Sequence, residues 1–187
     1  MTDEALLRLV REGHEEAFVE LYGRYRDPLF RFAYRMTSSV EAAEDLVHDC
    51  FLSLWRRSNG FRSERGSLRV FLYGTIRNLA FKRWRNKVWE DLADDVPDHS
   101  IQAMQFDMIA AQEMAIAVQQ AVEGLPPLYR EVLVLADYQD FGMAEIADVV
   151  NADIGTVKVR LHRARLQVKR QLAKELTHPA GKERRNA

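Results

Sequence analysis

The sequence predicts an all-α protein of two small helical domains joined by a flexible acidic linker. Apolar residues recur every three or four positions over most of the 187 residues, which is the period of one helix face. No segment alternates apolar and polar residues as a half-buried strand does. Charge is strongly segregated. Residues 91–124 contain acidic side chains but no lysine or arginine, whereas basic residues gather around 56–87 and 158–174.

A change in composition sets the expected domain boundaries. Residues 89–107 are acidic and weakly periodic and contain Pro97, a combination typical of a tether. The expected order is a first domain at 1–90, a linker at 91–109, a helix-turn-helix domain at 110–176 and a disordered basic tail at 177–187.

The single cysteine, Cys50, excludes an internal disulfide and fits a reducing cytoplasm. No apolar run approaches the length of a membrane span.

The first domain begins with amphipathic helices. Helical periodicity runs from Asp3 to about Met36, and Pro28 is expected to mark a kink or a restart. Ser38 or Ser39 should cap the next helix. The inward stripe of that helix is expected to be Leu46, Val47, Cys50, Phe51, Leu54 and Trp55. Its opposite face presents Asp45, His48, Asp49 and Leu52, which periodicity alone describes as a solvated edge.

A polar loop that contains Phe61 precedes a helix expected at about 68–87. One side of this helix, made of Leu68, Leu72, Ile76 and Leu79, should face a core. The other side carries Val70, Tyr73, Arg77, Phe81 and Trp84, surrounded by Arg69, Lys82, Arg83 and Arg85. Aromatics interleaved with cations suit single-stranded nucleic acid, because bases stack on rings and phosphates pair with cations. Each aromatic taken alone is more simply a core residue.

The stretch 141–174 predicts a helix-turn-helix, after two further helices at about 108–122 and 128–138. Its turn is Asn151-Ala152-Asp153, and Asp153 should cap the second helix. The apolar stripe of that helix is Val157, Leu161, Ala164, Val168 and Leu172. Its basic residues are Lys158, Arg160, Arg163, Arg165, Lys169, Arg170 and Lys174, with no acidic residue among them. A solvated bundle helix usually mixes charges, so this face favours DNA in the major groove.

Five segments in their order and spacing resemble a bacterial RNA polymerase sigma factor of the extracytoplasmic-function group, in the sigma-70 family. They are AFVELYGRY (17–25), EDLVHDCFLSLW (44–55), FLYGTIRNLAFKRWR (71–85), LPPLYREVLVL (125–135) and IGTVKVRLHRAR (154–165). The resemblance covers about residues 14–87 and 110–174. It implies a cytoplasmic protein, on the nucleoid when active, that binds core polymerase, directs it to promoters and helps to melt the duplex. It also implies an anti-sigma partner.

The resemblance implies roles for individual residues. Asp45, His48, Asp49 and Leu52 would dock on the clamp helices of the largest polymerase subunit. Phe61, Arg77, Asn78, Lys82, Arg83 and Arg85 would act at the −10 element, with Phe61 and Asn78 near a flipped-out base. Thr156, Lys158, Val159, His162 and Arg163 would act at the −35 element. The domain that carries them would also cover the polymerase flap tip.

Three positions depart from the family pattern. His48 stands where a glutamine is usual, and Val159 replaces a common serine, exchanging a polar contact for an apolar one. Gly142-Met143 replaces the usual Ser/Thr-aromatic pair, which should weaken the cap of the first helix of the motif.

Other functions explain less of the sequence. No nucleophile–base pair or metal-ligand spacing indicates an enzyme, so neither catalysis, a cofactor nor a metal is expected. A helix-turn-helix regulator outside the polymerase accounts for 125–174 but leaves the aromatic–arginine segment 69–85 unexplained. A DNA-processing enzyme would need clustered carboxylates, and Asp94, Asp95 and Asp98 cluster only in the linker. A structural helical module would not need two basic faces.

Overall fold

The computed structural model describes residues 1–56, 66–91 and 109–177, and these ranges contain eight helices and no strand. Phe61, most of the expected linker and residues 178–187 of the expected basic tail lie outside the described residues. The all-α prediction is confirmed. Within the described ranges no helix has the length and apolar composition that a membrane span requires.

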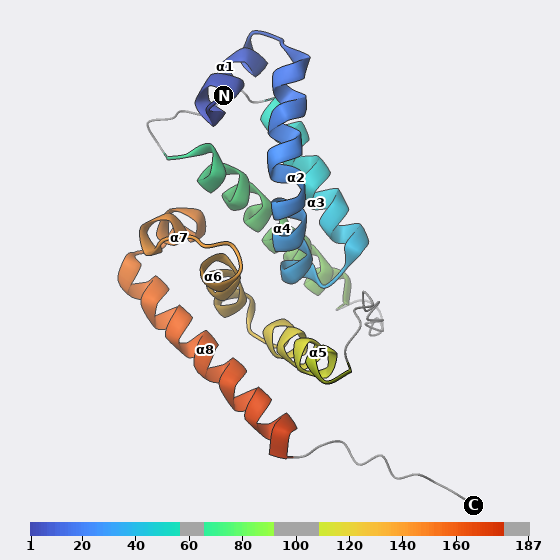
Figure 1. Ribbon diagram of the computed structural model, residues 1–187, viewed down its shortest axis with the longest axis vertical. Helices are drawn as coiled ribbons and strands as arrows, with labels where there is room; N and C mark the ends of the chain where they lie inside the picture. Colours follow the sequence, from blue (N-terminus) through green and yellow to red (C-terminus); the bar gives the residue numbers. More distant parts are fainter. Residues whose placement is uncertain (57–65, 92–108, 178–187) are drawn as a thin grey trace, which may run out of the picture.

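The N-terminal half is arranged around one long helix. Its helices are α1 (Asp3–Arg11), α2 (Glu15–Thr37), α3 (Val40–Arg56) and α4 (Leu68–Asp91). Helix α2 packs against the other three, as Figure 1 shows in blue and green. The sequence predicted a kink or restart at Pro28, but α2 continues through Pro28 as one helical element. It ends at Ser38, which adopts a left-handed conformation with φ 55°.

Local capping and burial in α3 follow the sequence prediction, with one exception. Ser39 Oγ accepts a hydrogen bond from the Ala42 amide at 3.2 Å, which caps the helix as expected. The inward stripe from Leu46 to Leu54 is buried. Trp55 was expected in the same stripe but is 43% exposed. It lies in the last turn of α3, where its ring packs edge-on against Phe18 and leaves its remaining surface in solvent.

The C-terminal half contains the predicted helix-turn-helix. Its helices are α5 (Ile109–Glu123), α6 (Pro127–Asp137), α7 (Met143–Val150) and α8 (Ile154–Thr177). Asn151 ends α7 in a left-handed conformation with φ 50°, which reverses the chain into α8. Val157, Leu161 and Ala164 of α8 are buried against α6 and α7, whereas the later stripe positions Val168 and Leu172 are half-buried.

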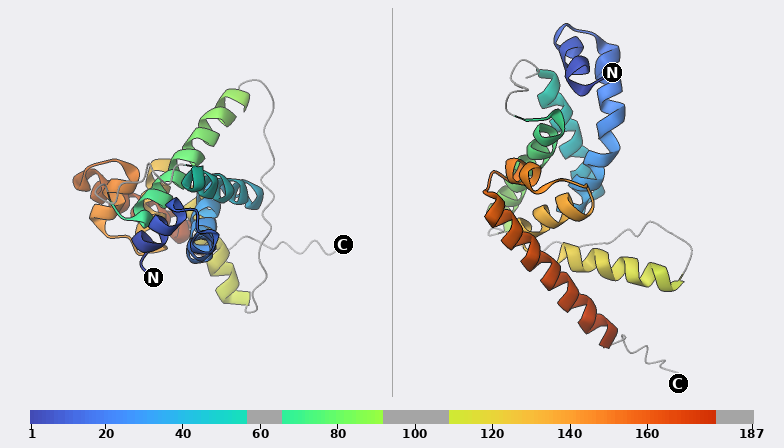
Figure 2. Two further views of the ribbon diagram at one scale, coloured as in Figure 1. Left: turned by 90° about the horizontal axis from the view of Figure 1, so that it is seen from above. Right: turned by 60° about the vertical axis from the view of Figure 1, so that its left-hand side comes forward.

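The two halves pack against each other. Helix α4 lies on α7, and α2 contacts α5 and α6 (Figures 1 and 2). Gly74 lies close to the α7 backbone, since a Cβ atom there would lie 3.8 Å from the Val149 carbonyl oxygen. An alanine would therefore fit at this position, and a longer side chain would meet the α7 backbone.

Burial of the α8 stripe predicts a large difference between two leucines of the same helix. Leu161→Ala should lower the free energy of unfolding by about 2–5 kcal/mol, because Leu161 is buried and its removal leaves a cavity. Leu166→Ala should change stability by only about 0.5 kcal/mol or less, because Leu166 is 38% exposed. Urea unfolding followed by circular dichroism measures both. Equal losses for the two variants would contradict the orientation of α8.

Candidate nucleic-acid interface

The start of α8 is fixed by an acidic cap. Asp153 accepts hydrogen bonds from the Thr156 amide, at 2.8 Å, and from the Thr156 hydroxyl. These bonds to the ionised form lower the pKa of Asp153, so the cap is charged at neutral pH. The predicted N-cap is confirmed. Thr156, one of the residues expected at the −35 element, is half-buried and has its hydroxyl engaged by this cap.

The expected base-facing residues of α8 share an outward face. Lys158, Val159, His162 and Arg163 are exposed, and Val157 and Leu161 on the opposite side are buried. Val159 is 50% exposed, so a branched apolar side chain stands in solvent between cations. A side chain in this position is available to contact a thymine methyl group in the major groove.

Two arginines of α8 have acidic partners on α6. Arg165 makes two hydrogen bonds to the carboxylate of Asp137, and Arg160 lies 3.4 Å from Oε1 of Glu131. From its sequence, this helix was expected to present a face of cations without acidic partners. That premise was wrong for Arg160 and Arg165, because their acidic partners come from another helix. Arg163 donates to the Tyr129 hydroxyl at 3.4 Å and remains exposed.

Helix α7 begins with a partial cap. The Gly142 amide donates to Oε2 of Glu145 at 2.9 Å, and no side chain caps the free amides of the first turn. A serine or threonine at this position would add the second half of a capping box. The α7 cap therefore lacks the bond from an N-cap side chain, which confirms the expected weakening.

Glu131 of α6 is the most unusual side chain near this surface, because its carboxylate is fully buried. Its Oε2 accepts a hydrogen bond of 2.7 Å from Nε of Arg77 on α4, and its Oε1 faces Arg160 on α8. Burial raises the pKa of Glu131, and the two guanidinium groups act against that shift. Sequence reasoning missed this residue. The sequence feature that could have revealed it is its spacing of four residues from Leu135, which places a carboxylate on the inward face of α6.

The residues expected at the −10 element divide into two environments. Arg77 is only 16% exposed and is held by Glu131. Asn78, Lys82, Arg83 and Arg85 are exposed. The side-chain oxygen of Asn78 accepts from Arg77 at 3.2 Å, and Arg83 lies 3.2 Å from Asp45 of α3. The structure thus brings one −10 candidate into contact with one polymerase-docking candidate.

The aromatic residues of α4 contact arginines of the same chain. Tyr73 is buried, as the simpler core reading predicted, and Phe81 and Trp84 are half-buried. The Arg77 guanidinium lies 4.6 Å from the centre of the Phe81 ring, and that of Arg130 lies 5.8 Å from the Trp84 ring. The aromatic–arginine pattern therefore has a structural role within this chain.

The expected polymerase-docking face of α3 is accessible. Asp45, His48 and Asp49 are exposed, and Leu52 is half-buried. His48 borders a small pocket of about 180 Å³ between α2 and α3. Tyr22, Arg26, Phe30, Glu44 and Val47 form the rest of its wall.

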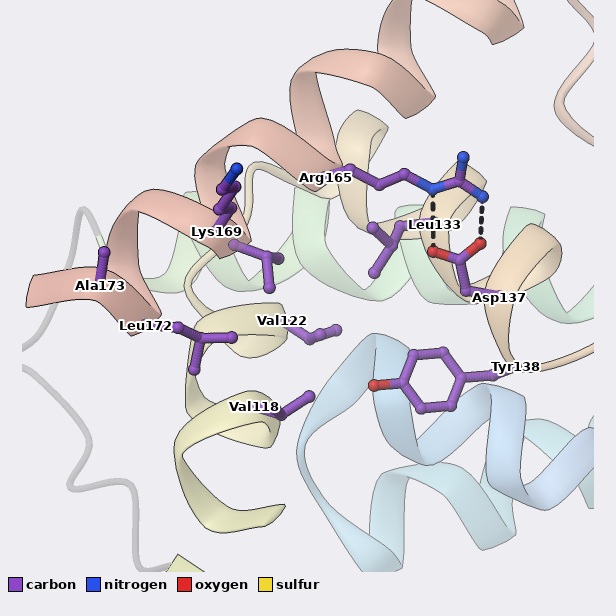
Figure 3. Close-up of a pocket in the computed structure, with 10 residues that line it drawn as sticks. Val118, Val122, Leu133, Asp137, Tyr138, Arg165, Lys169, Leu172 and Ala173 are labelled. Atoms are coloured by element: carbon purple, nitrogen blue, oxygen red, sulfur yellow. Dashed lines mark hydrogen bonds and ion pairs between the residues drawn. The ribbon is translucent and has the colours of Figure 1, made fainter. Parts of the chain in front are cut away.

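A larger groove lies between α5, α6 and α8 and was not predicted from the sequence. It has a volume of about 610 Å³ and mainly apolar walls. Figure 3 shows Val118, Val122 and Leu172 around it, with the Arg165–Asp137 pair at its rim. The apolar stripe of α8 was expected to be core throughout, but its last part, Val168 and Leu172, lines this groove.

Among the described residues, no group of three or more His, Cys, Asp or Glu is arranged to hold a metal ion.

Comparison with known proteins decides the family. Residues 21–90 match the family Sigma-70 region 2, and residues 115–168 match Sigma-70, region 4. The chain is 31% identical over 171 residues to the ECF RNA polymerase sigma factor SigM of Mycobacterium tuberculosis, covering 91% of this chain and 85% of SigM. The chain belongs to the ECF sigma factors of the sigma-70 family. This sigma factor is also 27% identical to SigW of Bacillus subtilis, covering 89% of this chain and 94% of SigW.

Solved structures support the fold of this sigma factor. The sigma factor RpoE from Bartonella quintana, in complex with the anti-sigma factor NepR, aligns with a TM-score of 0.70 at 24% identity, covering 83% of this chain and 96% of RpoE. CnrH, in complex with the cytosolic domain of CnrY, aligns with a TM-score of 0.71 at 22% identity, covering 92% of this chain and 98% of CnrH. As a sigma factor, the protein directs RNA polymerase to promoters for the initiation of transcription.

Proposed function

We propose that this sigma factor reads its promoter with two separate surfaces and holds core polymerase with a third. The −35 surface is the outward face of α8, the −10 surface is the exposed basic part of α4 with the segment 61–66, and the docking surface is the acidic face of α3. The observation that carries this proposal is the outward face of α8, where four expected base-facing residues are exposed over a buried apolar stripe.

Region 2, here residues 21–90, distinguishes this proposal from the alternative of a helix-turn-helix regulator. Such a regulator would need only the C-terminal half of the chain. The match to region 2 covers the aromatic–arginine segment that this alternative leaves unexplained, so the alternative is not favoured. We infer that the protein acts by binding rather than by catalysis, in the cytoplasm, and that it associates with the nucleoid when active.

The −35 surface predicts that base-reading and phosphate-binding residues of α8 behave differently. Arg163→Ala or Lys158→Ala should cost about 1–3 kcal/mol of binding, and the loss should depend on the base pair that the side chain contacts. Lys174→Ala should weaken all sequences alike and reduce the salt dependence, because a phosphate contact carries no sequence information. Fluorescence anisotropy with duplex promoters and base-substituted duplexes measures these effects. If all three variants weakened binding to every sequence equally, the assignment of α8 as the helix that reads the −35 element would be wrong.

The −10 surface predicts a defect confined to strand opening. Opening requires that a base leave the stack, at a cost of a few kcal/mol that the protein must recover by holding the base and the displaced strand. Asn78→Ala and Phe61→Ala should therefore keep polymerase binding and −35 affinity but lose open-complex formation. Permanganate footprinting of unpaired thymines on duplex promoters reports opening directly.

A matched control for this experiment lies on the same helix. Asn86 is an exposed asparagine two turns beyond Asn78, and Asn86→Ala should open the promoter like the wild type. A pre-melted promoter should restore part of the loss in the two test variants. Wild-type footprints for both Asn78→Ala and Phe61→Ala would rule out this assignment.

The docking surface predicts that one charge reversal separates polymerase binding from folding. Asp49→Arg should prevent holoenzyme formation, because a basic partner would then meet a like charge across the interface. Asp49 is exposed, so the change should leave the fold intact. Asp148→Arg, at an exposed position on α7, is the matched control and should co-purify with core polymerase. Normal co-purification of Asp49→Arg would refute the α3 docking face.

We also propose that the groove between α5, α6 and α8 receives the polymerase flap tip. Its apolar walls and charged rim, with Lys169 and the Arg165–Asp137 pair, suit an amphipathic helix that inserts apolar side chains. The solved relatives RpoE and CnrH are described in complexes, the former with an anti-sigma factor. By analogy, we propose that an anti-sigma factor also binds this protein.

A further inference from the structure

The outward face of α8 carries two exposed apolar side chains in line. Val159 and Leu166 are seven residues apart, which is close to two helical turns, so they lie one above the other on the helix surface. They are 50% and 38% exposed. Val159 is not part of the hydrophobic core, and valine forms helices less readily than alanine or lysine. Neither packing nor helix propensity therefore accounts for a valine at this position.

Basic side chains flank this apolar line on both sides. Helical spacing places Arg163 and Arg170 on one flank and Lys158 and Lys169 on the other, and all four are exposed. Lysine and arginine bind phosphates and the acceptor atoms of purines. The cations thus account for polar contacts with DNA, and the apolar line between them would face the base edges on the floor of the major groove.

Two polar neighbours of Val159 are already engaged within the protein. The Thr156 hydroxyl donates to the Asp153 carboxylate, and Arg160 is paired with Glu131. Both side chains are half-buried. Neither one supplies a free hydrogen-bonding group beside the valine, so the base pair opposite Val159 would meet an isopropyl group.

An apolar side chain discriminates between base pairs through one chemical group. In the major groove the bases present hydrogen-bond donors and acceptors, and the 5-methyl group of thymine is the apolar exception. Opposite thymine, Val159 buries an apolar group against another. Opposite cytosine, it displaces water from the amino group and offers no hydrogen bond in return. Because a β-branched side chain has one strongly preferred rotamer in a helix, the contact costs little side-chain entropy.

We propose that Val159 recognises a 5-methyl group, so that one position of the −35 element binds more tightly as thymine or 5-methylcytosine than as uracil or cytosine. The proposal rests on the −35 role proposed above for α8 and adds the chemical group that one side chain reads. It also fixes a position. Arg163 lies one turn further along α8, about 6 Å away, so the methyl group lies within about two base pairs of the pair that Arg163 contacts.

A test begins with the selection of the tightest sites for the full chain from a random duplex library. Each thymine of the selected site, on either strand, is then replaced singly by deoxyuridine, which removes the methyl group and nothing else. Fluorescence anisotropy of the wild type should show one position where this replacement weakens binding about fourfold, the value of one buried methyl group. With a C·G pair at that position, 5-methylcytosine should bind about fourfold tighter than cytosine.

Variants of Val159 identify the side chain that detects the methyl group. Val159→Ala shortens the side chain at an exposed position, so the fold should be unchanged. Val159→Ser shortens it and adds a hydroxyl. In both variants the preference for thymine over uracil and for 5-methylcytosine over cytosine should fall to about one.

Two control variants truncate exposed apolar side chains elsewhere. Leu166→Ala changes the same face of α8 about 10.5 Å further along the helix. Val19→Ala changes a valine of α2 that is 66% exposed. Both variants should keep the wild-type preference for the methyl group, which would show that the preference belongs to Val159 and not to the apolar surface in general.

Two results would overturn the proposal: no single deoxyuridine weakens binding of the wild type, or Val159→Ala keeps the wild-type preference. A sensitive thymine more than two base pairs from the pair at which Arg163→Ala shows its base dependence would contradict the position. Arg163→Ala on the same duplexes separates these failures from failure of the −35 assignment. If its loss still depends on the base pair, α8 reads DNA and only the methyl contact fails. If the selection yields no preferred sequence, the −35 role of α8 fails, and recognition of the methyl group fails with it.

Discussion

The structure depends on one buried carboxylate that is shared between two guanidinium groups. Glu131 is out of contact with water, and a charge in that position requires partners. Arg160 supplies one from the recognition helix, which ties α8 to α6, and Arg77 supplies the other from α4. A single side chain thus helps to orient α8, which we propose reads duplex DNA, and to hold α4, which we propose acts on the melted strand.

Local physical chemistry made much of the fold predictable. The 3.6-residue period identified the helices, and hydroxyl or carboxylate side chains marked their starts at Ser39 and Asp153, where the structure shows the expected hydrogen bonds. Leu161 is buried and Lys158 exposed because their positions on one helix face follow directly from spacing. The family resemblance then supplied the order of regions 2 and 4, which the comparisons confirmed.

Contacts between distant segments were not predictable from spacing. The sequence suggested that Arg160 and Arg165 needed a polyanion, but Glu131 and Asp137 pair with them from α6. The aromatic–arginine pattern around Arg77 suited single-stranded nucleic acid, but a guanidinium binds phosphate and carboxylate alike, and Arg77 pairs with Glu131. Trp55 fitted its stripe and is still partly exposed, since periodicity defines a direction and not what covers it. These outcomes are set by which helices meet.

Run-off transcription with the core polymerase of the source organism tests the account most directly. A transcript of defined length forms only if docking, promoter reading and strand opening all occur. The assay does not depend on the signal that controls the protein in the cell. On a panel of linear templates that includes the promoter of the protein's own gene, core polymerase alone should give no defined transcript, and addition of the protein should give transcripts of defined length. Protein that binds promoter DNA but yields no defined transcript with core polymerase on any template would contradict the account.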